Sequence, residues 1–353
     1  MKKFIAVLLC VAALVGVLVF LNDTFFNPQD TDLDPYGNEK ALKNNKQYNF
    51  LIMGHDRKAS LTDVMMLVSF DTAEGKAVVM QIPRDTYVEY EDHTYHKING
   101  VYNHCIGLAK EAEAEDAGLE ACVMTADFIA KAFNVKIHYS AVMDLDGFGQ
   151  IVDAIGGVRM DVPYDMKYED SAQDLYIDLE EGEQTLTGDE AEQFVRYRSG
   201  YLNADLGRGD AQKMFMAAFI NSFKENVNVF TLNAVAKEIY NNLTTDIGVR
   251  DMIRIAFKAM DADLSDITML TAPGGLASSY YVLNKDSLAK VLEESFNIFE
   301  DELSYDNVDT DVLFSYEGDP AMMAVYDRPA DEINYNKHNA EDVSKEEINV
   351  PLK

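Results

Sequence analysis

The sequence predicts a membrane-anchored protein whose outer part belongs to the mixed α and β class. Three observations support this interpretation: the chain begins with a long apolar run, short strand-like apolar segments follow it, and helical patterns come after those. With 353 residues and 48% hydrophobic content, the chain can bury one large core or two modest ones.

The N-terminal run has the length of a membrane-spanning helix. Residues 4–21 are apolar or glycine, and they lie between Lys2-Lys3 and Asn22-Asp23. A cleaved signal peptide is the alternative, but its apolar region usually has only about 7–15 residues, and no Ala-x-Ala cleavage signal follows this run. Since lysines precede the run and acidic residues follow it, we expect residues 1–3 in the cytoplasm, residues 4–21 in the cell membrane and the remainder outside.

The chain is strongly acidic, with 61 acidic and 30 basic residues and a formal net charge of -31. Such a charge repels phosphate backbones, and no basic patch with interleaved aromatic residues occurs, so nucleic acid is not an expected partner. An anionic substrate must therefore be bound by a local cluster of cations.

The segment after the anchor, residues 22–47, is polar and contains Pro28, Pro35 and Gly37, which predicts a stalk. Apolar patterns then predict strands at 48–54, 64–70 and 77–83 and helices at 121–133 and 144–155. Two further strands between 158 and 179 are expected to flank a surface loop at 163–174.

Thr187 and Glu190 have the spacing of a capping box, which predicts a helix that runs to about residue 197. A strongly apolar helix is expected around 209–224, and weaker helix and strand patterns continue to about residue 299. Residues 300–353 are acidic and polar, which predicts a largely disordered tail.

Three cysteines are present, and Cys10 lies inside the apolar run. Outside the cell, Cys105 and Cys122 could form a disulfide, or they could be two unrelated buried thiols. The sequence leaves both alternatives open, because it does not supply the geometry that a disulfide requires.

Two carboxylates occur where neighbouring strands are expected to end and begin. Asp56 follows the first strand-like run, and Asp63 precedes the second. Carboxylate oxygens of this kind suit Mg²⁺, which typically takes one or two of them and completes its coordination with water and substrate phosphates. The alternative is that both are ordinary turn or capping residues.

Several cations could bind an anionic substrate: Arg84, Lys97, Arg196, Arg198 and Arg208. The planar fork of arginine matches pairs of phosphate oxygens. Arg196 and Arg198 stand two residues apart, so both can meet one ligand only where the chain leaves helical geometry. Each cation taken alone could instead be a solvated or ion-paired surface residue.

Taken together, these segments resemble the LytR-CpsA-Psr family, bacterial enzymes that join teichoic acid or capsular polymers to peptidoglycan. The resemblance covers residues 49–222. Its most specific segments are Asn49-Phe-Leu-Ile-Met-Gly-His-Asp56, Asp63-Val-Met-Met, Gln81-Ile-Pro-Arg-Asp85, Lys97-Ile-Asn99, Gly156-Gly-Val158, Val162-Pro-Tyr-Asp-Met166, Gly188-Asp-Glu-Ala191, Arg196-Tyr-Arg198, and Asp205-Leu-Gly-Arg208 with Gln212.

The resemblance implies a catalytic domain over residues 48–299, built on a central mixed β-sheet flanked by helices, with a hydrophobic tunnel for a polyisoprenoid chain. It implies that Asp56 and Asp63 bind Mg²⁺, or Mn²⁺ in its place. The residues that it assigns to the pyrophosphate of a lipid carrier are Arg84, Lys97, Arg196, Arg198, Arg208 and Gln212.

The implied reaction transfers a glycan phosphate from a polyprenyl (undecaprenyl-type) pyrophosphate carrier to a hydroxyl of peptidoglycan. Arg84, Asp63 and Asp85 are the candidate catalytic residues, and Asp63 or Asp85 is the candidate general base. Family members commonly carry a basic residue and a serine where this chain has Leu61-Thr62, and many have an arginine at the position of Ala211. Two other functions stay open: a binding scaffold or regulator without turnover, and a lipid pyrophosphate hydrolase.

Overall fold

The computed structural model describes nine continuous ranges and scattered positions between them. The ranges are 47–56, 61–71, 75–90, 96–170, 175–197, 243–248, 267–296, 319–333 and 338–339, and the scattered positions lie between 211 and 226. The predicted membrane span at 4–21 lies outside the described residues, as does the predicted stalk apart from its last residue. Among the described helices, none combines the length and the apolar character that crossing a bilayer requires.

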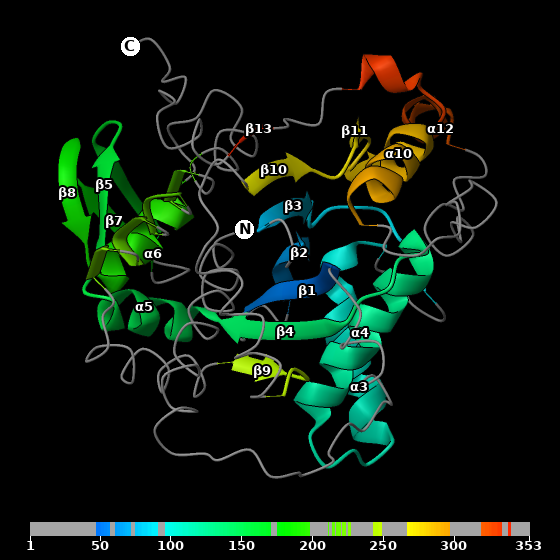
Figure 1. Ribbon diagram of the computed structural model, residues 1–353, viewed down its shortest axis with the longest axis horizontal. Helices are drawn as coiled ribbons and strands as arrows, with labels where there is room; N and C mark the ends of the chain where they lie inside the picture. Colours follow the sequence, from blue (N-terminus) through cyan, green and yellow to red (C-terminus); the bar gives the residue numbers. More distant parts are fainter. Residues whose placement is uncertain are drawn as a thin grey trace.

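A seven-stranded mixed sheet forms the centre of the fold (Figure 1). Its strand order is β13-β10-β3-β2-β1-β4-β9; β1 pairs with β4 and β3 with β10 in parallel, and the other neighbours are antiparallel. The strands are β1 (Gln47–Asp56), β2 (Leu61–Asp71), β3 (Lys76–Ile82), β4 (Tyr139–Asp144), β9 (Leu243–Thr245), β10 (Ile267–Thr271) and β13 (His338–Asn339). The predicted mixed α/β class with a central mixed sheet is confirmed.

Apolar side chains cover both faces of this sheet, as β1 shows. Phe50 and Ile52 belong to one buried cluster, and Leu51 and Met53 to another, because successive side chains of a strand point to opposite faces. A strand that is buried on both faces reads as a continuous apolar run, which is why the sequence pattern at 48–54 was visible.

Each face is covered by its own layer (Figure 1). One layer contains α3 (Val101–Glu111), α4 (Ala117–Phe133) and α10 (Lys285–Ser295). The other contains α5 (Leu145–Ala154), α6 (Gly188–Arg196) and two hairpins, β5 (Val158–Val162) with β8 (Gly182–Leu186) and β6 (Met166–Asp170) with β7 (Leu175–Leu179). The described positions of the predicted apolar helix at 209–224 are helical, and its Phe215 and Phe219 are fully buried in the second layer.

Local sequence signals fix the helix ends. The Thr187 side chain accepts from the backbone N–H of Glu190, and the Glu190 carboxylate accepts from the backbone N–H of Thr187, so the predicted capping box is confirmed. Asp116 caps α4 by accepting from two backbone N–H groups at 3.0 Å, and Asn134 ends that helix in the left-handed conformation.

One predicted element was wrong, because the expected loop at 163–174 contains strand β6. The helix predicted around 144–155 is confirmed as α5, which begins at Leu145 because Asp144 ends strand β4. In β6, Lys167, Tyr168 and Glu169 are all exposed, so Met166 is the one fully buried side chain of this strand. The sequence prediction also missed α3 and β4.

The C-terminal range 300–353 was expected to be largely disordered, but it contains folded elements. Helix α12 (Pro320–Tyr326) packs its buried Met322 and Val325 against the hairpin of β11 (Gly274–Ala277) and β12 (Tyr280–Leu283). Strand β13 completes one edge of the central sheet. The short apolar run in the tail is thus part of a small core.

Cys105 and Cys122 are free thiols on α3 and α4, and both are buried. Burial raises the pKa of both thiols above the ordinary value for cysteine. Of the two alternatives left open by the sequence, the structure therefore supports two separate buried thiols.

Candidate active site

A β-bulge presents Asp63 at the end of the β1–β2 pair. Gly54 pairs with Val64 and His55 pairs with Thr62, so Asp63 is an extra residue on β2. A bulge of this kind bends the strand and redirects a side chain, and it is common beside active sites. On the partner strand, the backbone of Asp56 pairs with Leu61, which places the two predicted metal ligands at the same end of neighbouring strands.

A tight turn after β3 presents the next two residues of the site. The backbone N–H and the hydroxyl of Thr86 both donate to the carbonyl oxygen of Pro83, at 3.0 and 2.6 Å. Arg84 and Asp85 occupy the turn between them. The backbone N–H of Asn99 donates to the carbonyl oxygen of Arg84, so the turn is also fixed to the segment that carries Lys97.

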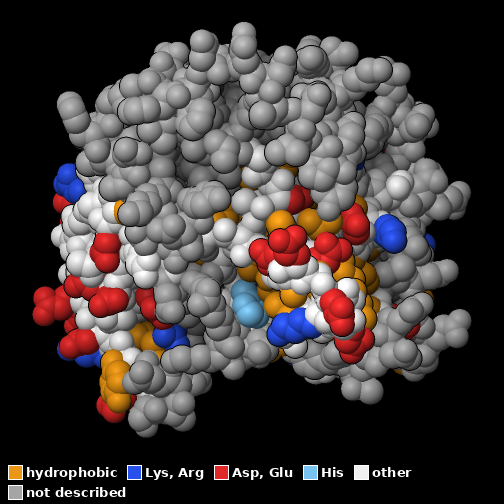
Figure 2. Space-filling model, turned by 90° about the horizontal axis from the view of Figure 1, so that it is seen from below, with side chains coloured by type: hydrophobic (Ala, Val, Ile, Leu, Met, Phe, Trp, Pro, Cys, Tyr) orange, Lys and Arg blue, Asp and Glu red, His pale blue; other side chains and the backbone are white. Residues whose placement is uncertain are grey.

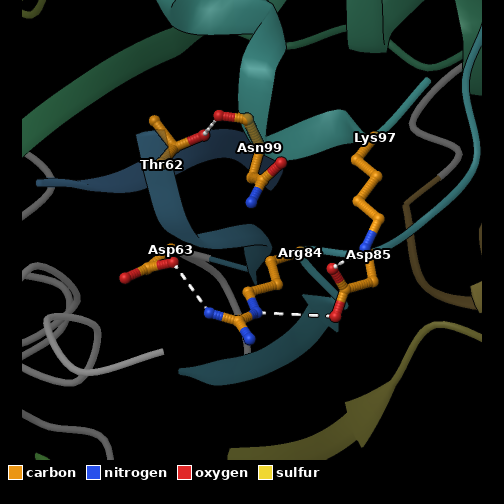
Figure 3. A network of polar contacts seen from close by, with 6 residues as sticks. All are labelled: Thr62, Asp63, Arg84, Asp85, Lys97 and Asn99. Carbon is orange, nitrogen blue, oxygen red and sulfur yellow. Dashed lines mark hydrogen bonds and ion pairs between the residues drawn. The ribbon is translucent and has the colours of Figure 1, made fainter. Parts of the chain in front are cut away.

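Four charged side chains form one continuous network (Figure 3). Arg84 Nη1 donates to Asp63 Oδ1 at 3.1 Å, and Arg84 Nε lies 3.5 Å from Asp85 Oδ2. The other oxygen of Asp85 accepts from Lys97 Nζ at 2.8 Å. Arg84 thus lies between two carboxylates, and Asp85 lies between two cations.

This network is neither fully buried nor fully solvated. The side chains of Arg84, Asp85 and Lys97 are 22%, 25% and 25% exposed, so a ligand from solvent can reach them. Partial exclusion of water strengthens each ionic contact relative to one on an open surface. Burial by itself would raise the pKa of Asp63, whereas the charge and the hydrogen bond of Arg84 act to lower it.

The structure brings together Asp63, Arg84, Asp85 and Lys97, as the sequence prediction expected. For Asp56 it places the backbone, whereas the side chain lies outside what is described. Arg198, Arg208 and Gln212 also lie outside the described residues.

Arg196 is the last residue of α6, where its Nη1 donates to the Glu192 carboxylate one turn earlier. The next residue, Tyr197, has extended backbone angles (φ -63°, ψ 137°). The chain therefore leaves helical geometry directly after Arg196, which is the condition stated above for Arg196 and Arg198 to meet one ligand.

Three neighbours of the network were missed as site residues. The Thr62 hydroxyl donates to the carbonyl oxygen of Asn99 at 3.1 Å, which ties β2 to the segment after Lys97 (Figure 3). The Asn99 side chain is 3% exposed, and the ring of Tyr280 lies beside Lys97. Asn99 belongs to the segment Lys97-Ile-Asn99 that resembles the family, so a signal for it was present. Tyr280 lies far outside residues 49–222, and no pattern in the sequence marked it.

The carboxylate of Asp63 is an oxygen donor of the kind that a hard divalent cation such as Mg²⁺ takes. Asp63 supplies a carboxylate at the bulge, and Asn99 Oδ1 is a buried oxygen with no hydrogen-bond partner among the described residues. Within the same part of the chain, no group of three or more His, Cys, Asp or Glu side chains gathers. Mg²⁺ commonly keeps several waters and takes only one or two carboxylates, so such a group is not required.

The described surface carries many carboxylates. Exposed ones lie on the hairpins, such as Asp161 and Glu183 on β5 and β8, and Figure 2 shows acidic side chains spread over one face of the molecule. The network holds two cations and two carboxylates and is formally neutral, so it is less negative than the carboxylate-rich surface, and an anionic group could approach Arg84 and Lys97 at short range.

A sequence model of the LytR_cpsA_psr family matches residues 22–297, well over half of the chain and the whole of the central sheet except β13. The chain belongs to the LytR_cpsA_psr family. The family match ends after α10, so α12 and β13 lie beyond it.

Named relatives agree with this membership. The polyisoprenyl-teichoic acid–peptidoglycan teichoic acid transferase TagU of Oceanobacillus iheyensis is 25% identical over 293 residues, which covers 79% of this chain and 85% of the relative. The transferase TagV of Bacillus subtilis, with the same descriptive name, is 25% identical over 327 residues, 85% of this chain and 79% of the relative. The crystal structure of B. subtilis TagU shares the fold, with a TM-score of 0.51 and 23% identity over 74% of this chain and all of that one.

Proposed function

We propose that this chain transfers a glycan phosphate from a polyprenyl pyrophosphate carrier to a hydroxyl of peptidoglycan, and so attaches a cell-wall glycopolymer. Membership of the LytR_cpsA_psr family and similarity to the teichoic acid transferases TagU and TagV support this function. The observation that carries the proposal is the network in which Arg84 and Lys97 share Asp85, because it fixes two cations side by side within reach of solvent.

Arg84 and Lys97 would bind the pyrophosphate oxygens. Phosphoryl transfer is promoted largely by positioning and by stabilisation of charge on the phosphate oxygens, and both side chains are already held in place by carboxylates. Arg196, Arg198, Arg208 and Gln212 complete the proposed set of phosphate ligands.

Asp56 and Asp63 would hold Mg²⁺, or Mn²⁺ in its place. When bound, the ion would neutralise charge on the pyrophosphate. The bulge aims Asp63 at the site, and the contact with Arg84 keeps its carboxyl ionised, which is the form that binds a cation.

Neither candidate general base suits that role well. Each Asp85 oxygen is within ionic contact of a cation, and Arg84 lowers the pKa of Asp63, which makes that carboxylate a weaker base. We therefore assign Asp85 the task of holding Arg84 and Lys97. As the acceptor oxygen bonds to the glycan phosphate, the P–O bond to polyprenyl phosphate would break and polyprenyl phosphate would leave. The hydroxyl proton would be lost late in the transfer, where a weak base such as Asp63 or a water molecule is sufficient.

The proposed location fits the proposed substrates. Residues 4–21 would anchor the chain, residues 1–3 would lie in the cytoplasm and the domain would lie outside the cell membrane. One substrate would then be held in the bilayer and the other in the wall beyond it.

The test uses the full chain in membranes or detergent, with a polyprenyl pyrophosphate-linked glycan, peptidoglycan and Mg²⁺. We expect a covalent phosphodiester between glycan and peptidoglycan, which Asp63→Asn should abolish. Asp161→Asn, which changes an exposed aspartate on β5, is the matched control and should leave transfer intact. Release of glycan phosphate without attachment would establish a hydrolase instead, and carrier binding without any turnover would establish a scaffold.

A further inference from the structure

Lys97 has a second contact besides Asp85. Its Nζ lies 5.9 Å from the ring centroid of Tyr280, within the range in which a cation is attracted to the face of an aromatic ring. Tyr280 is the first residue of β12, nearly two hundred residues further along the chain.

The hairpin that carries Tyr280 is bonded directly to the turn of the site. The backbone N–H of Tyr281 donates to the carbonyl oxygen of Asp85 at 2.8 Å, and the N–H of Tyr87 donates to the carbonyl oxygen of Tyr281 at 2.9 Å. The Tyr87 ring also packs edge to face on the Tyr280 ring, with 5.0 Å between centroids. Lys97, Asp85 and Tyr280 are therefore held in one bonded unit.

Helix α12 supports this unit from behind. Tyr87 belongs to the small buried cluster that includes Met322 and Val325 of α12, and the partly buried Tyr280 packs against this cluster. Asn284, which follows β12 and is fully buried, donates from Nδ2 to the carbonyl oxygens of residues 325, 326 and 328, at 2.9, 3.0 and 2.8 Å. Since the family match ends at residue 297, this support comes from a part of the chain that the match does not include.

We propose that Tyr280, supported by α12, is a positioning residue that holds the Lys97 ammonium group where it can bind the pyrophosphate. The inference rests on the proposed function. Asp85 uses one of the three N–H donors of Lys97, and the Tyr280 ring restricts the side chain without using another donor. Among the described residues Asp85 is the hydrogen-bond partner of Lys97 Nζ, so within that part of the chain two donors stay available for phosphate oxygens while the flexible stem of the lysine is kept in one place.

The first test compares Tyr280→Leu with Tyr280→Phe in the full chain. Tyr280→Leu removes the ring and should raise the KM for the carrier about two- to fivefold with little change in kcat, whereas Tyr280→Phe keeps the ring and should retain the wild-type KM. Tyr176→Leu, at an exposed position of β7, is the matched control and should change neither constant. In a Lys97→Met background, Tyr280→Leu should have no further effect, because its partner is gone.

The second test needs no substrate. It measures the rate at which the amine of Lys97 is acylated, by mass spectrometry, with exposed Lys167 as internal reference. The rate at Lys97 should be at least twofold faster in Tyr280→Leu than in wild type. It should be unchanged in Tyr280→Phe. If Tyr280→Leu fails to fold, as judged by circular dichroism, Tyr280→Met fills similar space without a ring.

The two tests separate the inference from the function on which it rests. Unchanged KM and unchanged labelling in a folded Tyr280→Leu or Tyr280→Met variant would overturn the inference while the proposed function stands. Faster labelling in a protein that shows no transfer at all would refute the proposed function and support the positioning contact.

Discussion

One added methyl group should destabilise the protein at Gly188 but not at Gly149, although the two glycines face each other where α5 and α6 cross. A Cβ at Gly188 would lie 2.2 Å from the carbonyl oxygen of Gly149, 2.6 Å from its carbonyl carbon and 2.8 Å from its Cα. These are backbone atoms, so no side chain can rotate away. A Cβ at Gly149 would come no closer than 3.6 Å to Gly188, which is ordinary contact.

The size of the effect follows from these distances. To restore ordinary contact, α6 would have to move by about 1 Å, the difference between 2.2 and 3.4 Å. Phe148 on α5 and Phe194 on α6 are both fully buried, so this movement would disturb packed core. Since overpacking typically costs about 1–3 kcal/mol, we expect Gly188→Ala to lower the free energy of unfolding by about 3 kcal/mol. Gly149→Ala lies inside a helix and should be neutral or stabilising by up to about 1 kcal/mol.

Urea unfolding of the full chain and both variants tests this prediction. The chain contains no tryptophan, so far-UV circular dichroism is the suitable signal. A Gly188→Ala variant as stable as wild type would refute the reasoning, and so would equal destabilisation by the two substitutions. The crossing also sets the direction of α6, so Gly188→Ala should weaken carrier binding through the displaced Arg196 at the helix end.

Three further outcomes are expected. Burial lowers the pKa of His138 to about 4, whereas an unfolded histidine titrates near 6.5. The stability that comes from the neutral form of His138 should therefore be complete above about pH 6.5 and be lost as the pH falls toward 4. Measured as unfolding free energy, the advantage of wild type over His138→Gln should grow by up to about 3 kcal/mol as the pH rises across this window. Asn284→Asp keeps the cap on the Ser287 N–H but replaces the donor that serves three carbonyl oxygens, so thermal unfolding should show a loss of about 2 kcal/mol or more. Arg196→Lys keeps the charge but loses the fork, so titration with a short-chain polyprenyl pyrophosphate should show binding weaker by about 1 kcal/mol, whereas an unchanged dissociation constant would argue against Arg196 as a phosphate ligand.

The features that the sequence predicted well depend on local signals. The capping box at Thr187 and Glu190 requires only four consecutive residues, and the structure confirms it. The residues of the charged network were also found, because Asp63, Arg84 and Lys97 each stand in a short segment that resembles the family. In these cases the sequence signal lies within a few residues of the feature that it predicts.

The features that were missed depend on contacts between distant segments. The bulge at Asp63 is a property of the register between two strands, and no residue type marks it. Tyr280 reaches Lys97 only because the parallel pairing of β10 with β3 brings the β11–β12 hairpin beside the turn after β3. Strand β6 was missed because it is short and exists through its pairing with β7, and only its first residue, Met166, is fully buried.

The strand order of the central sheet also has a consequence for the time at which it can form during synthesis. Strands β1, β2 and β3 are consecutive and antiparallel, so they can pair as soon as the first part of the domain has emerged. The outer side of β3 must wait for β10, and the outer side of β10 must wait for β13 at residues 338–339. An open strand edge can pair with other chains, so a ribosome that stops before residue 338 would release a protein with an unpaired strand edge. Strand β13 covers this side of β10 only after its two residues have been made.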